Sequence, residues 1–583
     1  MSAFVPYPAI ERHAVIGDRR TAALVAADGT IDWLCLPDYD GRVVFGALLD
    51  AQRGGFWRVG PAALWQGEQR YATAAPIAHT RWSTGEYELE LVDAMLDPGD
   101  RDESSERDRT VVRWLSCVRG DVECVSLFSP SNDFTPHATV SGAHLWSSSA
   151  DFAGSGSMRL VAGDSVWMVL ASGRRREWSV ADAARRLAEV EAFWADTVAR
   201  FDRRDADPRL TRSLVTIRLL EYAPAGSSVA APTTSVPERI GGGWNADYRL
   251  TWVRDASLSI STLAAAGDLA SARRFFDWLT TLESTTRSPL QVVYDIHGGT
   301  QPRQHVRRDL DGYRGSKPIR FGNHAFRQHQ HDKFGYLAEC ALTYLERGGA
   351  WDDRIWRLLV RVADFVSAHW DEPGNGIWEL ATRERYISGR VMSWAALDRI
   401  VRIAERLGCA PAQRARWQAA CAAIHDQVMT HGWSDTLNAF TQSLETEALD
   451  ASALLIPLVG FLPPSHPRVV ATVTAIAEQL TIDGCVYRFD PRKMPKTGPS
   501  PMGEYEGAFL PCTFWLATAF ALLGRPRDAE DTLAAVKRIA GPLGLFAEAI
   551  DPRGRTFLGN TPLLFSHVEY VRAVRALRVT ETS

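Results

Sequence analysis

The amino-acid sequence predicts a multidomain β plus all-α fold: an N-terminal antiparallel β-sandwich, a linker helix and a C-terminal (α/α)6 barrel. Residues 10–175 hold short alternating apolar runs broken by Gly, Asp or Ser, which is typical of strands and turns. Residues 178–204 change to a helical period, which then continues to the C-terminus. A chain of 583 residues also exceeds what one small core organises. We therefore expect the sandwich at 1–178, the linker helix at 179–205 and the barrel at 206–583.

Helical periodicity after residue 205 predicts twelve helices, which in antiparallel pairs can close into a ring of inner and outer helices. Their predicted ranges are 209–223, 254–267, 268–284, 324–347, 353–369, 391–407, 411–431, 448–457, 466–481, 507–523, 526–541 and 562–577. An inner helix touches neighbours on most sides, and GAFLPCTFWLATAFALLG (507–524) is apolar nearly all round, as that position requires. DDRIWRLLVRVADFVSAHW (352–370), with charge on one face, is typical of an outer helix.

Composition narrows the class of protein. The net charge is −5 and no basic block is present, which argues against a nucleic-acid partner. The N-terminus has no signal segment and no apolar stretch reaches about 18–20 residues, so we expect a cytoplasmic protein without a membrane partner. None of the eight cysteines forms a CxxC pair, which fits reduced thiols. The 20 tryptophans suit either a large core or stacking on sugar rings.

Two motifs that suggest a bound metal or phosphate are not supported by their surroundings. His324, His329 and His331 lie in NHAFRQHQHD, but no further ligands follow at metal-site spacing. The glycines of GGGWN (241–245) lack the Lys-Ser/Thr and the preceding strand of a phosphate-binding loop. We therefore expect neither a metal nor a cofactor.

Long loops should carry the function, because a ring of helices leaves a pit at one end that the loops line. These loops are predicted at 226–251, 285–322, 370–390, 482–506 and 544–567. Each combines an aromatic residue with Arg, Asp or Glu near Gly, which offers a stacking face, directional hydrogen bonds and close backbone approach. A polyol substrate needs that mixture.

Blocks in these loops resemble the bacterial branch of glycoside hydrolase family 15, the glucoamylase and trehalase-type α-glucosidases. The blocks are IGDRRTAALVAADGTIDWLCLP, YRLTWVRDAS, GYRGSKPIRFGN, NGIWEL, EGAFLPCTFWL and FLGNTPLLFSH, in that order from about residue 8 to 578. The resemblance implies an N-terminal β-domain, a helical linker and an (α/α)6 barrel, in agreement with the periodicity.

The resemblance also implies hydrolysis with inversion by two carboxyl groups about 6.5–9.5 Å apart. Glu379 in NGIWEL matches the general acid, and its apolar neighbours Ile377 and Trp378 suit a carboxyl group with a raised pKa. Glu548 in LFAEAIDP matches the general base. Glu504 and Glu506 compete for that role, although Glu506 is expected rather to line the site.

Further matches assign residues that bind the sugar. Arg254 and Asp255 match the pair that holds glucose hydroxyls, and Tyr248 and Trp252 match aromatics that contact the ring. Other residues expected at the site are Arg320, Trp378, Arg488, Glu506 and Trp33. For Trp33 two interpretations stay open, closure of the pit from the β-domain or burial in a core.

We therefore expect an inverting exo-acting α-glucosidase whose only assigned partner is an α-glucoside. Three alternatives stay open: a trehalase of the same family, an inverting disaccharide phosphorylase, and a non-catalytic glycan-binding protein. The sequence departs from the family where GNTPLLFSH replaces the usual GNFPQAFSH and where Ala549 replaces a polar residue. These departures leave the preferred linkage open, and the sequence does not indicate an oligomeric state.

Overall fold

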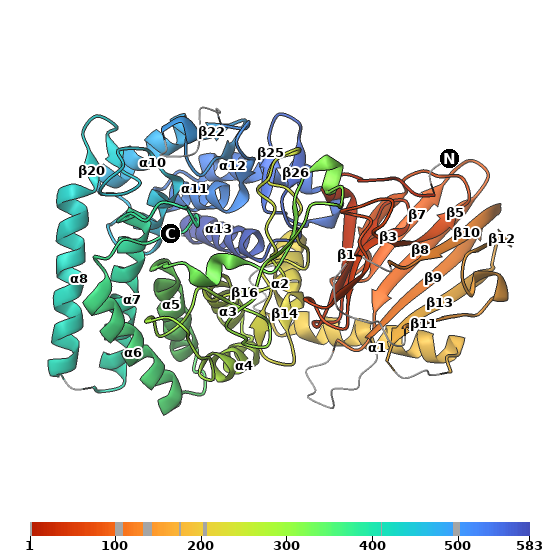
Figure 1. Ribbon diagram of the computed structural model, residues 1–583, viewed down its shortest axis with the longest axis horizontal. Coiled ribbons are helices and arrows are strands. Elements are labelled where there is room, and N and C mark those ends of the chain that lie inside the picture. The colour runs from red at the N-terminus through yellow and green to blue at the C-terminus, as the bar shows by residue number, and fades with distance from the viewer. Residues whose placement is uncertain are drawn as a thin grey trace.

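The computed structural model describes residues 3–98, 109–131, 134, 143–173, 177–201, 207–409, 411–493 and 502–582. In this part of the chain a β-sandwich lies beside a barrel of helices, as Figure 1 shows. The helix α1 (Val180–Ala199) runs along the sandwich toward the barrel. Ser179 caps α1 by accepting a hydrogen bond from the Asp182 backbone N–H, which explains why the helix begins there. The predicted fold class is confirmed.

Two antiparallel sheets form the sandwich. In the described residues one sheet has the order β1-β2-β3-β5-β10-β12, with β4 paired to β3, and the other has the order β11-β13-β9-β8-β7-β6. The first sheet contains β1 (His13–Gly17), β2 (Ala22–Ala26), β3 (Thr30–Leu36), β4 (Arg42–Phe45), β5 (Phe56–Pro61), β10 (Asp121–Ser129) and β12 (Gly156–Val161). The second contains β6 (Glu68–Tyr71), β7 (Ala78–Ser83), β8 (Glu88–Met95), β9 (Arg109–Arg119), β11 (Ala143–Ser147) and β13 (Ser165–Ser172). Contacts of β8 with β1 and β5 join the sheets face to face.

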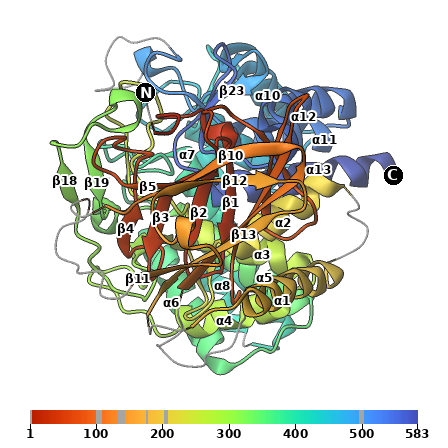
Figure 2. The same cartoon turned by 90° about the vertical axis from the view of Figure 1, so that its right-hand side faces the viewer.

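The barrel is a closed ring of inner helices surrounded by outer ones. In the described residues the inner helices are α3 (Val253–Ala265), α5 (Asp332–Glu346), α7 (Ile387–Arg406), α9 (Leu455–Leu458), α11 (Leu510–Leu522) and α13 (Leu564–Thr582). The outer helices are α2 (Pro208–Leu219), α4 (Leu269–Leu279), α6 (Asp353–His369), α8 (Pro411–His431), α10 (Pro467–Gln479) and α12 (Pro526–Ala540). Each inner helix contacts the next, and the contact of α13 with α3 closes the ring. Figure 2 shows the barrel helices behind the strands of the sandwich.

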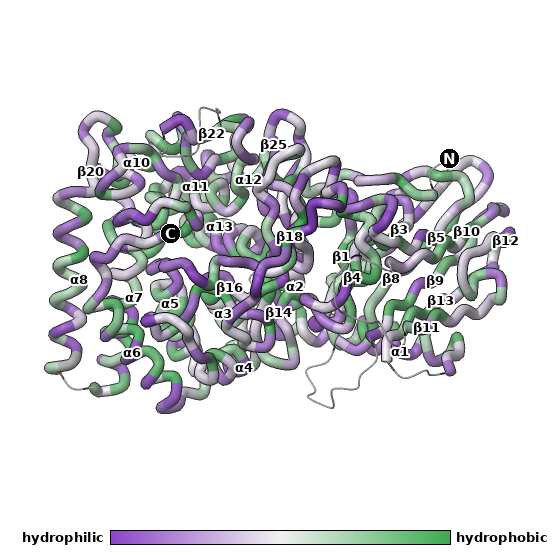
Figure 3. The backbone as a smooth tube through the Cα atoms, in the orientation of Figure 1, coloured by the Kyte–Doolittle hydropathy of each residue, from purple (hydrophilic) through white to green (hydrophobic). Residues whose placement is uncertain are grey.

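Burial separates the two rings as predicted. Residues 510–521 of α11 are all buried, whereas α6 buries one stripe with helical spacing, Ile355, Leu358, Leu359, Val362, Ala363 and Val366. Figure 3 shows hydrophobic and hydrophilic residues alternating along the outer helix α8. No helix of the described residues is long and apolar enough to cross a bilayer. The residue limits of the three predicted domains stay a prediction.

Two predicted helices differ from the structure. The segment 324–347 is α-helical only from Asp332, because His324–Arg327 form a 3-10 turn and the following residues run beside the NGIWEL loop. The segment 448–457 begins with a 3-10 turn at Ala451–Leu454 and continues as the short α9.

Short two-residue and three-residue strands tie the long loops together. They are β14 (Glu221–Tyr222), β15 (Ser227–Ser228), β16 (Thr251–Trp252), β17 (Val293–Tyr294), β18 (His305–Arg307), β19 (Ile319–Phe321), β20 (Trp433–Ser434), β21 (Ala439–Phe440), β22 (Thr481–Ile482), β23 (Cys485–Val486), β24 (Ala508–Phe509), β25 (Ala549–Asp551) and β26 (Thr556–Leu558). Two of these strands lie directly before inner helices, β16 before α3 and β24 before α11, which fixes the loops at that end of the barrel.

Candidate active site

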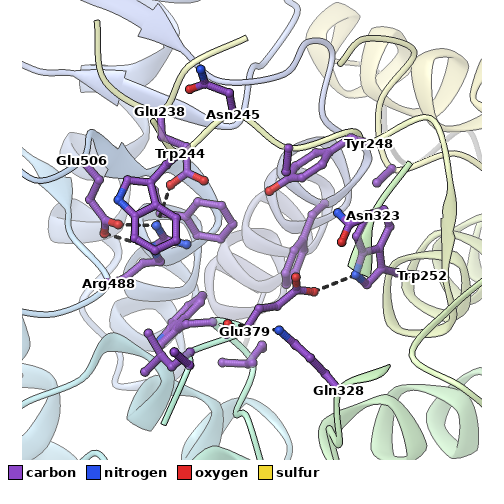
Figure 4. A pocket seen from close by; sticks show the side chains of 18 of the residues that line it. Glu238, Trp244, Asn245, Tyr248, Trp252, Asn323, Gln328, Glu379, Arg488 and Glu506 are labelled. Carbon is purple, nitrogen blue, oxygen red and sulfur yellow. Dashed lines mark hydrogen bonds and ion pairs between the residues drawn. The ribbon is translucent and has the colours of Figure 1, made fainter. Parts of the chain in front are cut away.

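A cavity of about 360 Å³ lies where the loops that precede α3, α5, α7, α11 and α13 meet. Most of the predicted site residues line it, namely Tyr248, Trp252, Arg254, Asp255, Arg320, Trp378, Glu379, Arg488 and Glu506. Aromatic rings and charged groups therefore share one hollow, although they come from segments far apart in the sequence. Figure 4 shows Glu379, Glu238, Arg488 and the aromatic side chains around this pocket.

Glu379 is partly buried and held in an unusual backbone conformation. Its φ is +59°, in the left-handed region that residues other than glycine rarely adopt. The Trp252 indole Nε1 donates a 2.7 Å hydrogen bond to Glu379 Oε1, and Gln330 Nε2 donates to the same oxygen over 3.3 Å. Burial raises the pKa of the Glu379 carboxyl, while the nearby Arg254 charge opposes the shift. A carboxyl group that keeps its proton above the ordinary range is suited to donate it.

The loop that carries Tyr248 and Trp252 joins both predicted catalytic glutamates. Trp252 ends β16, pairs with Val293 across the ladder and leads directly into α3. The Tyr248 and Trp252 rings lie 5.5 Å apart between centroids, close to edge-on. While Trp252 binds Glu379, the Tyr248 hydroxyl donates a 2.5 Å hydrogen bond to Glu548 Oε1. The short segment 248–252 therefore positions both carboxyl groups, Glu379 through Trp252 and Glu548 through Tyr248.

Glu548 lies behind Tyr248 rather than on the cavity wall. It is 1% exposed and absent from the residues that line the cavity. Its second oxygen, Oε2, accepts a 3.1 Å hydrogen bond from the Asn560 backbone N–H. Gly559 has φ +75°, and a Cβ there would lie 2.4 Å from Glu548 Oε2. Glycine at 559 therefore lets the backbone pass close to the carboxylate.

Opposing effects act on the ionisation of Glu548. Burial and the negative charge of Glu238 raise the pKa of the carboxyl to about 8. The hydrogen bonds from Tyr248 and the Asn560 N–H stabilise the ionised form and oppose that increase. The pKa of Glu548 thus depends on its immediate neighbours.

Arg254 and Asp255 form an ion pair at the start of α3. Arg254 Nε donates a 3.0 Å hydrogen bond to Asp255 Oδ2, and its Nη1 donates to the Ile377 carbonyl over 3.3 Å. Asp332 lies 3.6 Å from the same guanidinium group. The Arg254–Asp255 ion pair is thus hydrogen-bonded to the loop that carries Glu379, the predicted acid. Both Arg254 and Asp255 line the cavity.

Arg488 joins two carboxylates on another wall. Its guanidinium group donates to both oxygens of Glu506 and, over 2.6 Å, to Glu238 Oε2. It also lies over the rings of Trp378 and Phe509, at 5.8 and 5.4 Å from their centroids. These contacts fix Arg488 and leave little freedom for Glu506.

Comparison with known protein families gives two matches that together cover most of the chain. Residues 206–529 match the model of glycosyl hydrolases family 15, and residues 6–181 match a trehalase-like N-terminal domain. The first match covers more than half of the chain.

The chain belongs to glycosyl hydrolases family 15.

Full-length relatives agree with this assignment. A trehalase of Mycobacterium tuberculosis is 32% identical, over 98% of this chain and 89% of the relative. A trehalase of Thermoplasma volcanium is 29% identical, over 98% of this chain and 94% of the relative. A crystal structure of a bacterial glucoamylase complexed with acarbose shares the fold, with a TM-score of 0.69, 13% identity, and coverage of 99% of this chain and 95% of that one. The family 15 enzyme is a glycoside hydrolase, which confirms the resemblance and the predicted enzyme class.

Some predicted residues lie away from the cavity of the family 15 enzyme. Trp33 is completely buried in β3, and its indole donates a 2.8 Å hydrogen bond to the Pro232 carbonyl. The structure thus places Trp33 in the core that joins sandwich and barrel. Glu504 is exposed to solvent. Arg320 lines the cavity, but its guanidinium group donates to the Gly243 and Asn245 carbonyls and so supports the loop.

Several cavity residues of the family 15 enzyme were not predicted. They are Glu238, Trp244, Asn245, Asn323, Gln328 and Phe565, among others. The 226–251 loop was identified as functional, so the run PERIGGGWN offered a signal for Glu238 and Trp244. Gln328 falls in the segment 324–347 that was predicted to be a helix rather than a loop, and Asn323 directly precedes that segment, at the end of the block GYRGSKPIRFGN.

The histidines of the HxH motif pack beside the site without forming a ligand set. His329 and His331 have ring centroids 4.5 Å apart, and burial lowers the pKa of both imidazoles. In the described residues no group of three or more His, Cys, Asp or Glu side chains is arranged to hold a metal ion.

Proposed function

We propose that this family 15 enzyme is a trehalase that hydrolyses the α-glucosidic bond with inversion, Glu379 acting as general acid and Glu548 as general base. The observation that carries the proposal is the aromatic segment that holds both carboxyl groups, with the Trp252 indole on Glu379 and the Tyr248 hydroxyl on Glu548. Inversion needs two carboxyl groups with different protonation, placed on opposite sides of the scissile bond.

Glu379 supplies the proton to the leaving oxygen. Its Oε1 is occupied by Trp252 and Gln330, whereas Oε2 accepts no hydrogen bond from any described residue and belongs to a side chain that lines the cavity. The substrate oxygen can therefore approach that second oxygen. Burial favours the protonated form, as the acid role requires.

Glu548 takes a proton from the attacking water. The base must be ionised, and because burial and Glu238 raise its pKa to about 8, that form predominates only above this pH; the donors at Tyr248 and Asn560 favour it. Tyr248 lines the cavity and its hydroxyl donates to Glu548, so the proton moves in relay: the hydroxyl gives its proton to Glu548 Oε1 and takes one from the attacking water.

Trehalose is the substrate that we favour over a longer glucan. The relatives that cover almost the whole chain are named trehalases, and their likeness includes the N-terminal domain. The sugar itself is held by the Arg254–Asp255 pair, Trp252, Trp378 and Arg488, which offer hydroxyl partners and ring faces in one cavity.

The test is a substrate panel in phosphate-free buffer. Purified enzyme is incubated with trehalose, maltose and isomaltose, and free glucose and glucose 1-phosphate are measured. We expect glucose from trehalose without added phosphate. Proton NMR of early product should show α- and β-glucose in equal amounts, because inversion changes one anomeric carbon of trehalose and leaves the other. Phosphate-dependent glucose 1-phosphate would indicate a phosphorylase, and binding without glucose release would indicate a glycan-binding protein.

A further inference from the structure

Residues 238–244 form a turn at the cavity that contributes two side chains of different chemistry. The Glu238 backbone N–H donates a 3.3 Å hydrogen bond to the Trp244 carbonyl, which closes the turn around three glycines. The Gly241 N–H donates to Ser316 Oγ over 2.9 Å, and Arg320 donates to the Gly243 carbonyl over 2.8 Å. The turn is thus anchored at both its tip and its end.

Trp244 presents an open aromatic face. It lines the cavity yet remains 53% exposed, and its ring centroid lies 5.8 Å from that of Tyr505. A large apolar ring that is half exposed beside a cavity lined by aromatic and charged side chains offers a face on which a sugar ring can stack. Its exposure places it on the solvent side of the pocket, whereas Arg254 and Asp255 are buried and Glu379 is partly buried.

Glu238 presents an acceptor oxygen. Its Oε2 accepts from Arg488 over 2.6 Å, whereas Oε1 accepts no hydrogen bond from any described residue. The Glu238 residue is only 9% exposed and lines the cavity, so this oxygen faces the enclosed space. Figure 4 shows Glu238 beside Trp244, across the open part of the pocket from Glu379.

We propose that the 238–244 turn binds the leaving sugar, with Glu238 accepting one of its hydroxyls and Trp244 stacking on its ring. This inference rests on the proposed function, because it assigns the second ring of the disaccharide that Glu379 cleaves. Sugar hydroxyls donate hydrogen bonds, and a buried carboxylate accepts them more strongly than a neutral group does. Arg488 holds the acceptor in place.

The experiment compares two substrates that differ in the second ring. Trehalose has a leaving glucose, whereas α-glucosyl fluoride has none and still needs the same general base and glucose pocket. The measured quantity is the ratio of kcat/KM for trehalose to kcat/KM for α-glucosyl fluoride. Changes in the ionisation of Glu548 affect both substrates and cancel in this ratio.

For Glu238→Gln we expect the ratio to fall about tenfold or more, the usual effect of losing a hydrogen bond to a charged group. Trp244→Ala should lower the ratio as well, and Trp244→Phe should recover most of it because the stacking face is kept. Glu478→Gln, the same change on the exposed face of α10, should leave the ratio unaltered.

Two results would overturn the inference. An equal loss of kcat/KM on both substrates would place the turn at the first glucose or in the scaffold, and an unchanged kcat/KM on both would show that the turn does not take part in recognition. If Glu238→Gln does not fold, the comparison of Trp244→Ala with Trp244→Phe tests the inference, because the Trp244 side chain is half exposed and its replacement should not prevent folding. Failure of the proposed function is seen separately, as wild-type enzyme that cleaves α-glucosyl fluoride but not trehalose.

Discussion

The Tyr248 hydroxyl donates a 2.5 Å hydrogen bond to Oε1 of Glu548, a residue 300 positions away in the sequence. Four residues after Tyr248, the Trp252 indole donates a 2.7 Å bond to Glu379. The spacing of two aromatics on one loop therefore links the environments of both glutamates. Substitutions that alter these hydrogen bonds should therefore change the pKa of the glutamates, which a pH profile of activity can measure.

Tyr248→Phe removes the donor on Glu548 and keeps the ring. Hydrogen bonds to charged groups contribute about 1.5–3 kcal/mol, so kcat/KM should fall roughly 10- to 100-fold. Because the ionised form of Glu548 loses a stabilising partner, its pKa should rise and the limb of the pH profile that it governs should move to higher pH. The measurement is kcat/KM from pH 4 to 9; an unmoved profile would contradict the base role.

Glu238→Gln should move the same limb in the opposite direction. The Glu238 charge raises the pKa of Glu548, so its neutralisation should lower that pKa and shift the limb to lower pH. The two variants form a matched pair, since both alter a neighbour of Glu548 but with opposite sign. Shifts in the same direction would mean that neither neighbour acts through Glu548.

Glu379→Gln separates proton donation from the other steps. The amide cannot donate an acidic proton but fits the hydrogen bond from Trp252. We expect a loss of about 100-fold or more on trehalose, within the usual range for general acid catalysis. α-Glucosyl fluoride should lose far less, because fluoride leaves with little protonation. Equal loss on both substrates would argue against the acid role.

Gly559→Ala tests the close backbone approach to Glu548. The new Cβ would lie 2.4 Å from Glu548 Oε2, and the φ of +75° adds strain of about 1 kcal/mol or more. Both activity and the free energy of unfolding should fall. Gly348→Ala is the matched control, with φ +78° and open space around the Cβ. It should lose only the conformational part of the stability and keep full activity.

His567 gives a prediction on stability. It is buried, accepts a 3.1 Å hydrogen bond from the Phe546 N–H, and has its pKa lowered from 6.5 to about 3 by burial. Below about pH 6.5 the unfolded chain takes up a proton there that the folded protein does not, so folded stability falls as pH drops toward 3. The slope is about 1.4 kcal/mol per pH unit for this group. His567→Gln should flatten the dependence of unfolding free energy on pH by that amount; an unchanged slope would show that other groups cause it.

The order of elements was predictable because it follows from local periodicity. Alternating runs in residues 10–175 and helical runs after 205 correspond to the strands and helices of the structure. Errors occurred where tertiary contacts compete with propensity, as in 324–331, whose backbone binds the NGIWEL loop through the His329 carbonyl and Asn375 N–H.

The sequence by itself determined the fold class, the family and the residue types of the site, because periodicity and short blocks are local properties. Only the tertiary structure decided that Glu548 lies behind Tyr248, that Trp33 is in the core and that Glu238 faces the cavity. Those positions depend on contacts between loops brought together by closure of the helix ring, such as the 127-residue separation of Trp252 and Glu379. No local sequence pattern specifies which side chains line the cavity and which lie behind them.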